Sequence, residues 1–213
     1  MGSLTNGRQG GPQRPLVAFD FDGTLSFRDS FVAFLTWRTG LVRRTVGFAL
    51  LSSALLAYLG HRDRGRLKAA AVRIHLKGLK RADLEADCNA FASSPLGRRL
   101  IRPDAEQCWR RWRDAGAELV IVTASPEEIV APFAKRLGAD RLIGTRLVFD
   151  AEDRVEGDLE TPNCRGPEKV VRLQDVYGPD VHLTAAYGDS SGDREMLGLA
   201  DEEGYRVFTG RPR

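Results

Sequence analysis

Residues 16–25 read LVAFDFDGTL, and this stretch decides the predicted fold and the predicted site. The apolar residues from Leu16 to Phe19 lie between a proline and two acidic residues, which is typical of a short buried strand. Side chains two positions apart on an extended chain point to the same side, so the carboxylates of Asp20 and Asp22 are expected to face one site. Gly23 then allows the chain to turn and a ligand to approach the backbone closely.

Two further apolar runs, at 117–122 and 183–187, predict strands of the same kind, and a weaker strand is expected at 205–208. Four stretches with helical patterning separate them, at 104–115, 126–137, 167–177 and 192–199. This alternation predicts an α/β fold: a Rossmann-like parallel sheet with helices on both faces. A hairpin is expected within 145–160, around the acidic turn 150–153.

The segment 26–100 is almost wholly helical in pattern and separates the first and second core strands. We expect it to form a helical cap, inserted into a catalytic core of residues 15–25 and 101–213, after a disordered tail at 1–14. Residues 45–59 carry no charge and fall short of the roughly 20 apolar residues that span a bilayer. Three interpretations stay open for them: a helix packed within the cap, a helix docked on a membrane surface, or a transmembrane helix.

The composition bounds the class of protein and its partners. Hydrophobic residues make up 42% and charged residues 29%, which is typical of globular proteins. A net charge of +3 is too small for the basic surface of a nucleic-acid-binding protein, so no nucleic-acid partner is expected. The basic clusters fit either solvated helix faces or attraction to anionic lipids and phosphorylated ligands. Three cysteines without metal-binding spacing favour a reducing, cytoplasmic location, with membrane association left open.

Polar residues follow each core strand at the edge of the sheet where such folds bind ligands. Thr123 and Ser125 follow the second strand, and Asp189 and Asp193 follow the third. Clustered carboxylates suit covalent attack, proton transfer and the binding of Mg²⁺, which prefers oxygen ligands. Lys169, in the helix predicted at 167–177, adds a positive charge suited to phosphate oxygens. The set predicts magnesium-assisted chemistry on a phosphorylated substrate.

At these positions the sequence resembles the haloacid dehalogenase superfamily of phosphatases. Its four motifs occur in order: FDFDGTL at 19–25, IVTASP at 121–126, Lys169 within GPEKVVRL at 166–173, and YGDSSGDREML at 187–197. The resemblance implies a phosphoric monoester hydrolase that uses Mg²⁺. The helical insertion between the first two motifs, together with CRGPEK at 164–169, is similar to the subgroup of phosphoserine phosphatase and the C-type phosphatidylglycerophosphate phosphatase.

The resemblance also implies roles for individual residues. Asp20 would attack phosphorus and form an aspartyl-phosphate, and Asp22 would protonate the leaving oxygen and then activate water. Thr123 and Lys169 would hold the phosphoryl oxygens. Magnesium would be bound by Asp20, the backbone carbonyl of Asp22, and Asp189, with Asp193 supporting this shell directly or through water.

Gly23, Ser125 and Asp29 are predicted to contact the substrate. Asp29 lies nine residues after Asp20, close to where phosphoserine phosphatases carry a substrate-binding glutamate, although an N-cap of a helix explains it equally well. The sequence around Asp29 and the uncharged 45–59 favour an amphipathic or lipid phosphate over a small phosphorylated molecule such as phosphoserine. A phosphotransferase, and an inactive membrane-associated or nucleic-acid-binding module, are the remaining alternatives. The oligomeric state is not predicted.

Overall fold

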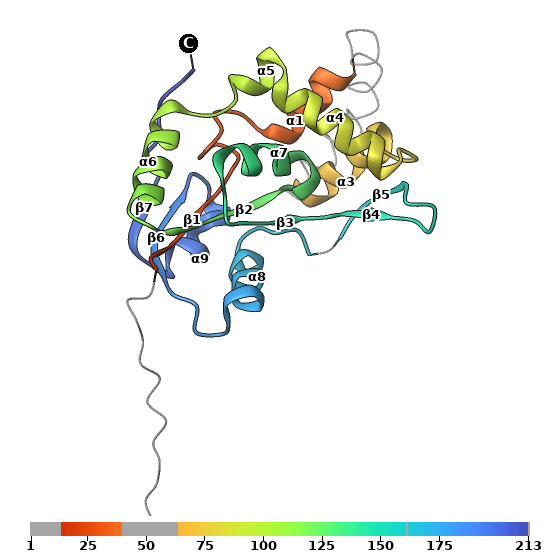
Figure 1. The fold of residues 1–213 in the computed structure, drawn as a ribbon. Helices are drawn as coiled ribbons and strands as arrows, with labels where there is room; N and C mark the ends of the chain where they lie inside the picture. The colour runs from red at the N-terminus through yellow and green to blue at the C-terminus, as the bar shows by residue number, and fades with distance from the viewer. Residues whose placement is uncertain (1–13, 40–63, 161, 213) are drawn as a thin grey trace, which may run out of the picture.

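A five-stranded parallel sheet organises the computed structural model, which describes residues 14–39, 64–160 and 162–212 (Figure 1). Its strands are β1 (Leu16–Phe19), β2 (Glu118–Pro126), β3 (Arg141–Thr145), β6 (Leu183–Gly188) and β7 (Ala200–Tyr205). They lie in the order β3-β2-β1-β6-β7, and every neighbouring pair is parallel. β1 is central: Phe19 lies opposite Ile121 of β2 on one side and Tyr187 of β6 on the other. The predicted strand after Pro15 is therefore confirmed as the centre of the sheet.

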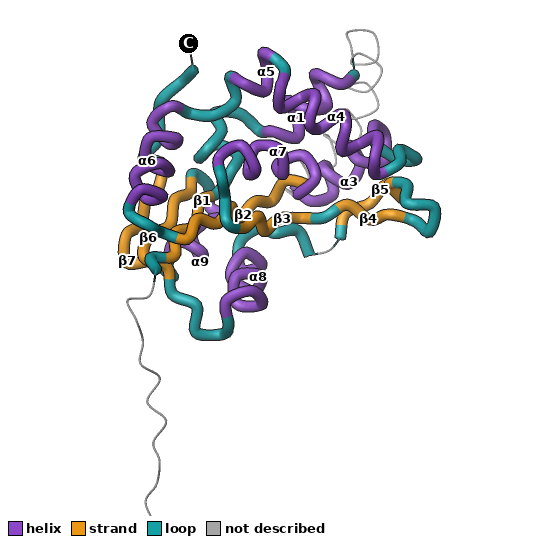
Figure 2. The backbone as a smooth tube through the Cα atoms, in the orientation of Figure 1, coloured by secondary structure: helices purple, strands orange, loops and turns teal. Residues whose placement is uncertain are grey.

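Helices cover both faces of this sheet, as Figure 2 shows. One face carries α6 (Pro103–Asp114) and α7 (Glu127–Leu137), and the other carries α8 (Pro167–Tyr177) and α9 (Arg194–Leu197). Alternation along β1 supplies both layers, since Val17 and Phe19 belong to the core on the α6 and α7 side and Ala18 to the smaller core on the other side. The α/β, Rossmann-like class predicted from the sequence is confirmed.

Local sequence explains where the helix after β2 begins and ends. Glu127 and Glu128 occupy the first turn of α7, and Lys135 and Arg136 the last, so both pairs favour the helix dipole. The helix ends at Gly138, which adopts a left-handed conformation with φ of 68°.

Four helices are described between β1 and α6: α1 (Ser30–Arg38), α3 (Arg64–His75), α4 (Arg81–Ser93) and α5 (Pro95–Arg98). Aromatic contacts connect them to the core. The Phe91 ring of α4 lies 5.6 Å from that of Phe34 on α1 and 5.7 Å from that of Phe133 on α7. The division of the chain into a core and a separate cap stays a prediction, and the segment 45–59 lies outside the described residues.

The predicted hairpin is present. It consists of β4 (Leu147–Phe149) and β5 (Val155–Leu159), which pair antiparallel. Its second strand borders the connection between α3 and α4, where the backbone of Val155 accepts from Gly78 and donates to Leu79, both at 2.8 Å. The hairpin thus extends from the sheet toward α3 (Figure 1).

Three sequence-based assignments need correction. The last strand is β7 at 200–205, not 205–208, and Phe208 instead packs its ring 5.4 Å from that of Tyr187. The helix expected at 192–199 is a 3₁₀ turn, η1 (Ser191–Asp193), followed by the single turn of α9. Arg14 was assigned to the disordered tail, yet its guanidinium donates to the carbonyl of Gly116 at 2.9 Å. The edge strand β3 was not predicted at all.

No helix within the described ranges is both long and apolar enough to cross a membrane.

Candidate active site

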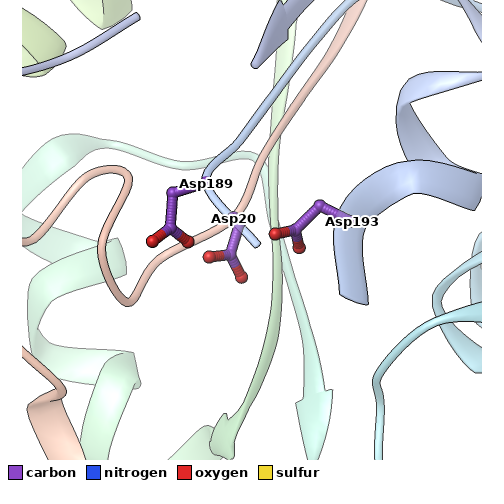
Figure 3. A group of neighbouring side chains, drawn as sticks. All are labelled: Asp20, Asp189 and Asp193. Atoms are coloured by element: carbon purple, nitrogen blue, oxygen red, sulfur yellow. The ribbon is translucent and has the colours of Figure 1, made fainter. Parts of the chain in front are cut away.

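Three aspartates gather at the carboxyl edge of the sheet (Figure 3). Asp20 directly follows β1, and its backbone N–H donates to the carbonyl of Tyr187 on β6 at 2.8 Å. Asp189 follows β6, and Asp193 ends the turn η1. One carboxylate oxygen from each of the three lies within 4.8 Å of the others. β1 and β6 flank the point at which the strand order reverses, where α/β sheets bind ligands.

Lys169 reaches this group from the first turns of α8. Its ammonium donates to Asp20 Oδ1 at 2.7 Å, to Asp193 Oδ1 at 2.6 Å and to the carbonyl of Val122 at 2.7 Å. These bonds use all three ammonium protons. With 1% of its side chain exposed, Lys169 is a buried cation fixed between two carboxylates.

The electrostatics of the group differ from one carboxylate to the next. Burial raises the pKa of Asp20 to about 7, although the nearby charge of Lys169 acts in the opposite direction. Burial also raises the pKa of Asp189, helped by the charge of Asp193. For Asp193 burial is opposed by the charge and hydrogen bond of Lys169, and the pKa falls below its usual value. Lys169 has a raised pKa because its two acidic partners outweigh the effect of burial.

Two glycines allow the carboxylates to lie this close to the backbone. Gly23 has φ of 87°, and a Cβ at this position would collide with the carboxylate of Asp189. A Cβ on Gly188 would lie 2.5 Å from the Cβ of Asp193. The glycine of the first motif is therefore required by the neighbouring acidic residue as well as by the turn.

The acidic group has the donor chemistry for a small hard cation. Both oxygens of Asp193 already accept protein hydrogen bonds, from Lys169 and from the backbone and hydroxyl of Ser190. Within the described part of the chain, the second oxygen of Asp20 and the carboxylate of Asp189 have no such bonds and face each other across the group. Carboxylate oxygens at this spacing fit Mg²⁺. The carboxylate of Asp22 is not a member of this group.

Asp22 is held separately, by donors on each of its oxygens. The backbone N–H of Ser30, at the start of α1, donates to Oδ1 at 2.7 Å. The hydroxyl of Ser125 donates to Oδ2. Asp20 and Asp22 thus face a common pocket, as predicted, while only Asp20 contacts the lysine.

The two polar residues of the second motif are buried beside the pocket. Thr123 Oγ1 accepts from the backbone N–H of Ser125 at 3.1 Å, and among the described residues its hydroxyl donates to no partner. Neither Thr123 nor Ser125 lines the pocket itself, whereas Ala124 between them does. Ser125 is fully buried and uses its proton on Asp22. The structure therefore places Ser125 against Asp22, whereas the sequence predicted a substrate contact.

A pocket of 280 Å³ opens in front of the aspartates, and most of the residues that line it are polar or charged. Asp29 lies on its rim, where it also acts as the N-cap of α1 by accepting from the backbone of Val32 at 2.9 Å. Both interpretations of Asp29 thus fit its position. Five polar or charged lining residues were not predicted from the sequence: Arg28, Lys68, Asn163, Arg165 and Ser190. Arg165 and Ser190 lie within the motif segments 164–169 and 187–197. Lys68 belongs to a basic run in which no local pattern indicates a site.

Comparison with known proteins agrees with this geometry. The model of the haloacid dehalogenase-like hydrolase family matches residues 17–198. Protein CicA of Caulobacter vibrioides is 59% identical over 92% of this chain and 88% of its own length. A phosphoserine phosphatase of Halobacterium salinarum is 30% identical over 87% of this chain and 82% of its own. A solved phospho-aspartyl intermediate analogue of phosphoserine phosphatase has a TM-score of 0.59 and 21% identity, covering 90% of this chain and 85% of that one. The chain therefore belongs to the haloacid dehalogenase-like hydrolase family, as a phosphatase-type enzyme with the phosphoserine phosphatase fold.

Proposed function

We propose that this protein is a magnesium-dependent phosphomonoester hydrolase in which Asp20 is the covalent nucleophile. One observation carries the proposal: Asp20 is buried at the end of the central strand, bonded to Lys169, and faces a pocket shared with Asp22 and Asp189. A carboxylate placed this way has one oxygen fixed by an ammonium and the other directed to a ligand. The solved aspartyl intermediate analogue of the same fold supports this role.

The reaction divides into two balanced steps. Asp20 forms a bond to phosphorus while the bond from phosphorus to the leaving oxygen breaks, and Asp22 gives its carboxyl proton to that oxygen. Asp22 then accepts a proton from water as the water oxygen attacks phosphorus, and the bond to Asp20 breaks to release phosphate. Thr123, whose hydroxyl donates to no partner among the described residues, would give its proton to a phosphoryl oxygen. Lys169 keeps Asp20 oriented and offsets negative charge that builds up beside it.

Asp20 and Asp189 are the residues we assign to direct contact with Mg²⁺, with the backbone carbonyl of Asp22 as a third oxygen. Asp193, whose oxygens are both occupied, would support the shell from outside or through water. Magnesium supplies positive charge that offsets the phosphoryl oxygens during transfer.

The pocket favours a small polar phosphate ester. A volume of 280 Å³ is at the lower end for ligand sites, and Phe27 and Ala124 are the apolar lining residues among the described ones. A small polar ester would fit this volume as a whole, whereas of the lipid phosphate that the sequence favoured only the phosphorylated headgroup would fit. The similarity to a phosphoserine phosphatase supports a small substrate too. Membrane contact through 45–59 stays a prediction, since those residues are outside the described ranges.

The direct test is phosphate release by Asp20→Asn across phosphoserine, sugar phosphates, nucleotides and lipid phosphates. We expect wild-type activity on small polar esters with added Mg²⁺, loss of activity with chelator, and no turnover by Asp20→Asn, because an amide does not attack phosphorus. Circular dichroism and thermal unfolding of the variant serve as the folding control. Near-normal turnover by folded Asp20→Asn would refute the mechanism.

A further inference from the structure

Lys68 links the region between β1 and β2 to the second motif. It lies on α3, and its ammonium donates to the carbonyl of Ala124 at 3.1 Å and to the hydroxyl oxygen of Ser125 at 3.2 Å. Both acceptors lie near the end of β2, more than fifty residues away in the sequence. Lys68 also lines the active-site pocket together with Asp22.

The direction of every bond in this chain of contacts follows from the chemical groups. An ammonium only donates and an ionised carboxylate only accepts, so the single hydroxyl proton of Ser125 must go to Asp22. The order is Lys68 to Ser125 to Asp22. Ser125 is fully buried, and each bond in such a series polarises the next. Lys68 therefore both orients the Ser125 hydroxyl and strengthens its bond to Asp22.

Asp22 is consequently held by two helices, α1 and α3, that both belong to the segment between β1 and β2. The start of α1 supplies the Ser30 N–H on one oxygen, and α3 acts through Ser125 on the other. Each carboxylate oxygen retains a second lone pair, on which Asp22 can carry a proton directed to the pocket.

The other catalytic groups do not depend on Lys68. Asp20 is bonded to Lys169, and Asp193 is bonded to Lys169 and Ser190. Loss of Lys68 should leave these bonds, and hence the nucleophile and the acidic group, unchanged.

We propose that Lys68 is a positioning residue that orients Asp22 through Ser125 for proton transfer to the leaving oxygen. The proposal rests on the proposed function, since it assigns Asp22 as the proton donor. Proton transfer to the leaving oxygen would then depend on the contact between α3 and the end of β2. If Lys68 instead bound the leaving group directly, its loss would lower activity only on substrates whose leaving group carries a negatively charged substituent.

The experiment compares two substrates of similar size, 4-nitrophenyl phosphate and benzyl phosphate, in which the alcohol part of the ester carries no ionised group. The nitrophenolate leaves without protonation, whereas the basic benzyl alkoxide requires a proton. In Lys68→Met we expect kcat/KM for benzyl phosphate to fall about 10- to 100-fold, part of the roughly 10²- to 10⁴-fold that acid–base catalysis supplies. The fall for 4-nitrophenyl phosphate should be less than about threefold, because proton transfer contributes little there.

Four further variants make the result specific. Ser125→Ala should show the same substrate selectivity, and the double variant should be no worse than the single ones, since both changes break one series of bonds. Lys68→Arg keeps donors and should recover part of the benzyl phosphate activity. Lys77→Met, which removes an exposed lysine outside the pocket lining, is the matched control and should not discriminate between the substrates.

Equal losses on both substrates, or additive losses in the double variant, would overturn the proposal. So would a loss confined to a third substrate, phosphoserine, whose leaving group carries a carboxylate, because that result would make Lys68 a substrate contact. If Lys68→Met does not fold, Lys68→Gln and Ser125→Ala answer the same question. Asp20→Asn separates the two hypotheses, because turnover by that variant refutes the proposed function. If Asp20→Asn is inactive and the Lys68 variants lose equal activity on both substrates, only the role of Lys68 is refuted.

Discussion

Two hollows on this protein contain many charged residues, yet only one has the properties of a catalytic site. The active-site pocket measures 280 Å³, and a second hollow along the outer side of β3, here called the edge hollow, measures 610 Å³. In the edge hollow, charges of opposite sign pair on the surface, as Arg146 and Glu127 do at 3.2 Å, with 63% of the arginine side chain exposed. In the active-site pocket, three aspartates lie together, and two of them, Asp20 and Asp193, share one buried lysine.

The difference shows that neither the size of a hollow nor its number of charges identifies the site. Like charges placed together and out of water are costly, and they persist where the chemistry requires them. The raised pKa of the Asp20 carboxyl reflects that cost, and no comparable burial of carboxylates occurs among the edge-hollow pairs described here.

The largest expected effect comes from removing the shared cation. Lys169→Met leaves two buried carboxylates without their partner, and we expect activity to fall about 10³-fold and stability by about 3–5 kcal/mol. The matched change in the edge hollow, Arg146→Met, breaks an exposed pair and should cost no more than about 1 kcal/mol, with unchanged activity. Urea unfolding and phosphate release measure both variants. Similar stability losses in the two would remove the distinction between the hollows.

A smaller effect tests the close packing of the acidic group. Gly23→Ala should lower activity about 10²-fold, because the new methyl group displaces the Asp189 carboxylate. Gly78→Ala is the matched control, since its φ of 83° is nearly the same and nothing lies within 4 Å of the added Cβ. Both variants should lose about 1–2 kcal/mol from backbone strain. Equal activity of the two would show that the glycine of the first motif serves only the turn.

The third effect concerns pH. The pKa of Asp20 rises from 3.8 to about 7 on folding, so between these values the folded protein binds a proton that the unfolded chain releases. Asp20 should therefore make the metal-free protein less stable as pH rises from about 4 to about 7, with no further change above. The measurement is the difference in free energy of unfolding between wild type and Asp20→Asn, in chelator, at about pH 5 and pH 8. If the free energy of unfolding changed with pH in the same way in both proteins, Asp20 would be ionised throughout this pH range.

Sequence patterns predicted those parts of the fold that have strong local signals. The run before Asp20 and the helices after β2 and before β6 follow directly from periodicity and capping. The β3 segment RLIGT is too short and too mixed to be identified alone, and it is a strand because it pairs with β2. The acidic β7 segment ADEEGY was missed because pairing with β6 determines its register, where Gly204 leaves the space that the Tyr187 ring fills.

The residues of the site likewise divide into those that lie in sequence motifs and those that only the folded chain brings to the pocket. Asp20, Asp22, Lys169, Asp189 and Asp193 lie in motifs, and the structure brings all five to one edge of the sheet. Lys68 and Arg28 were not predicted, because they reach the pocket from the segment between β1 and β2 and only the folded chain places them there. The bond between Ser125 and Asp22 likewise joins residues 103 positions apart.

The most direct test of the central claim is to trap the covalent intermediate. Wild-type enzyme is mixed with Mg²⁺ and 4-nitrophenyl phosphate, whose leaving group needs no proton from Asp22. The mixture is quenched rapidly in acid and digested, and its peptides are examined by mass spectrometry. We predict a phosphoryl group on the peptide that contains Asp20, absent from Asp20→Asn and increased in Asp22→Asn, whose amide does not activate water for the second step. A phosphoryl group on another residue would contradict the assignment of Asp20 as the nucleophile. So would turnover without a burst and without a phosphoryl group on Asp20, in both the wild-type enzyme and Asp22→Asn.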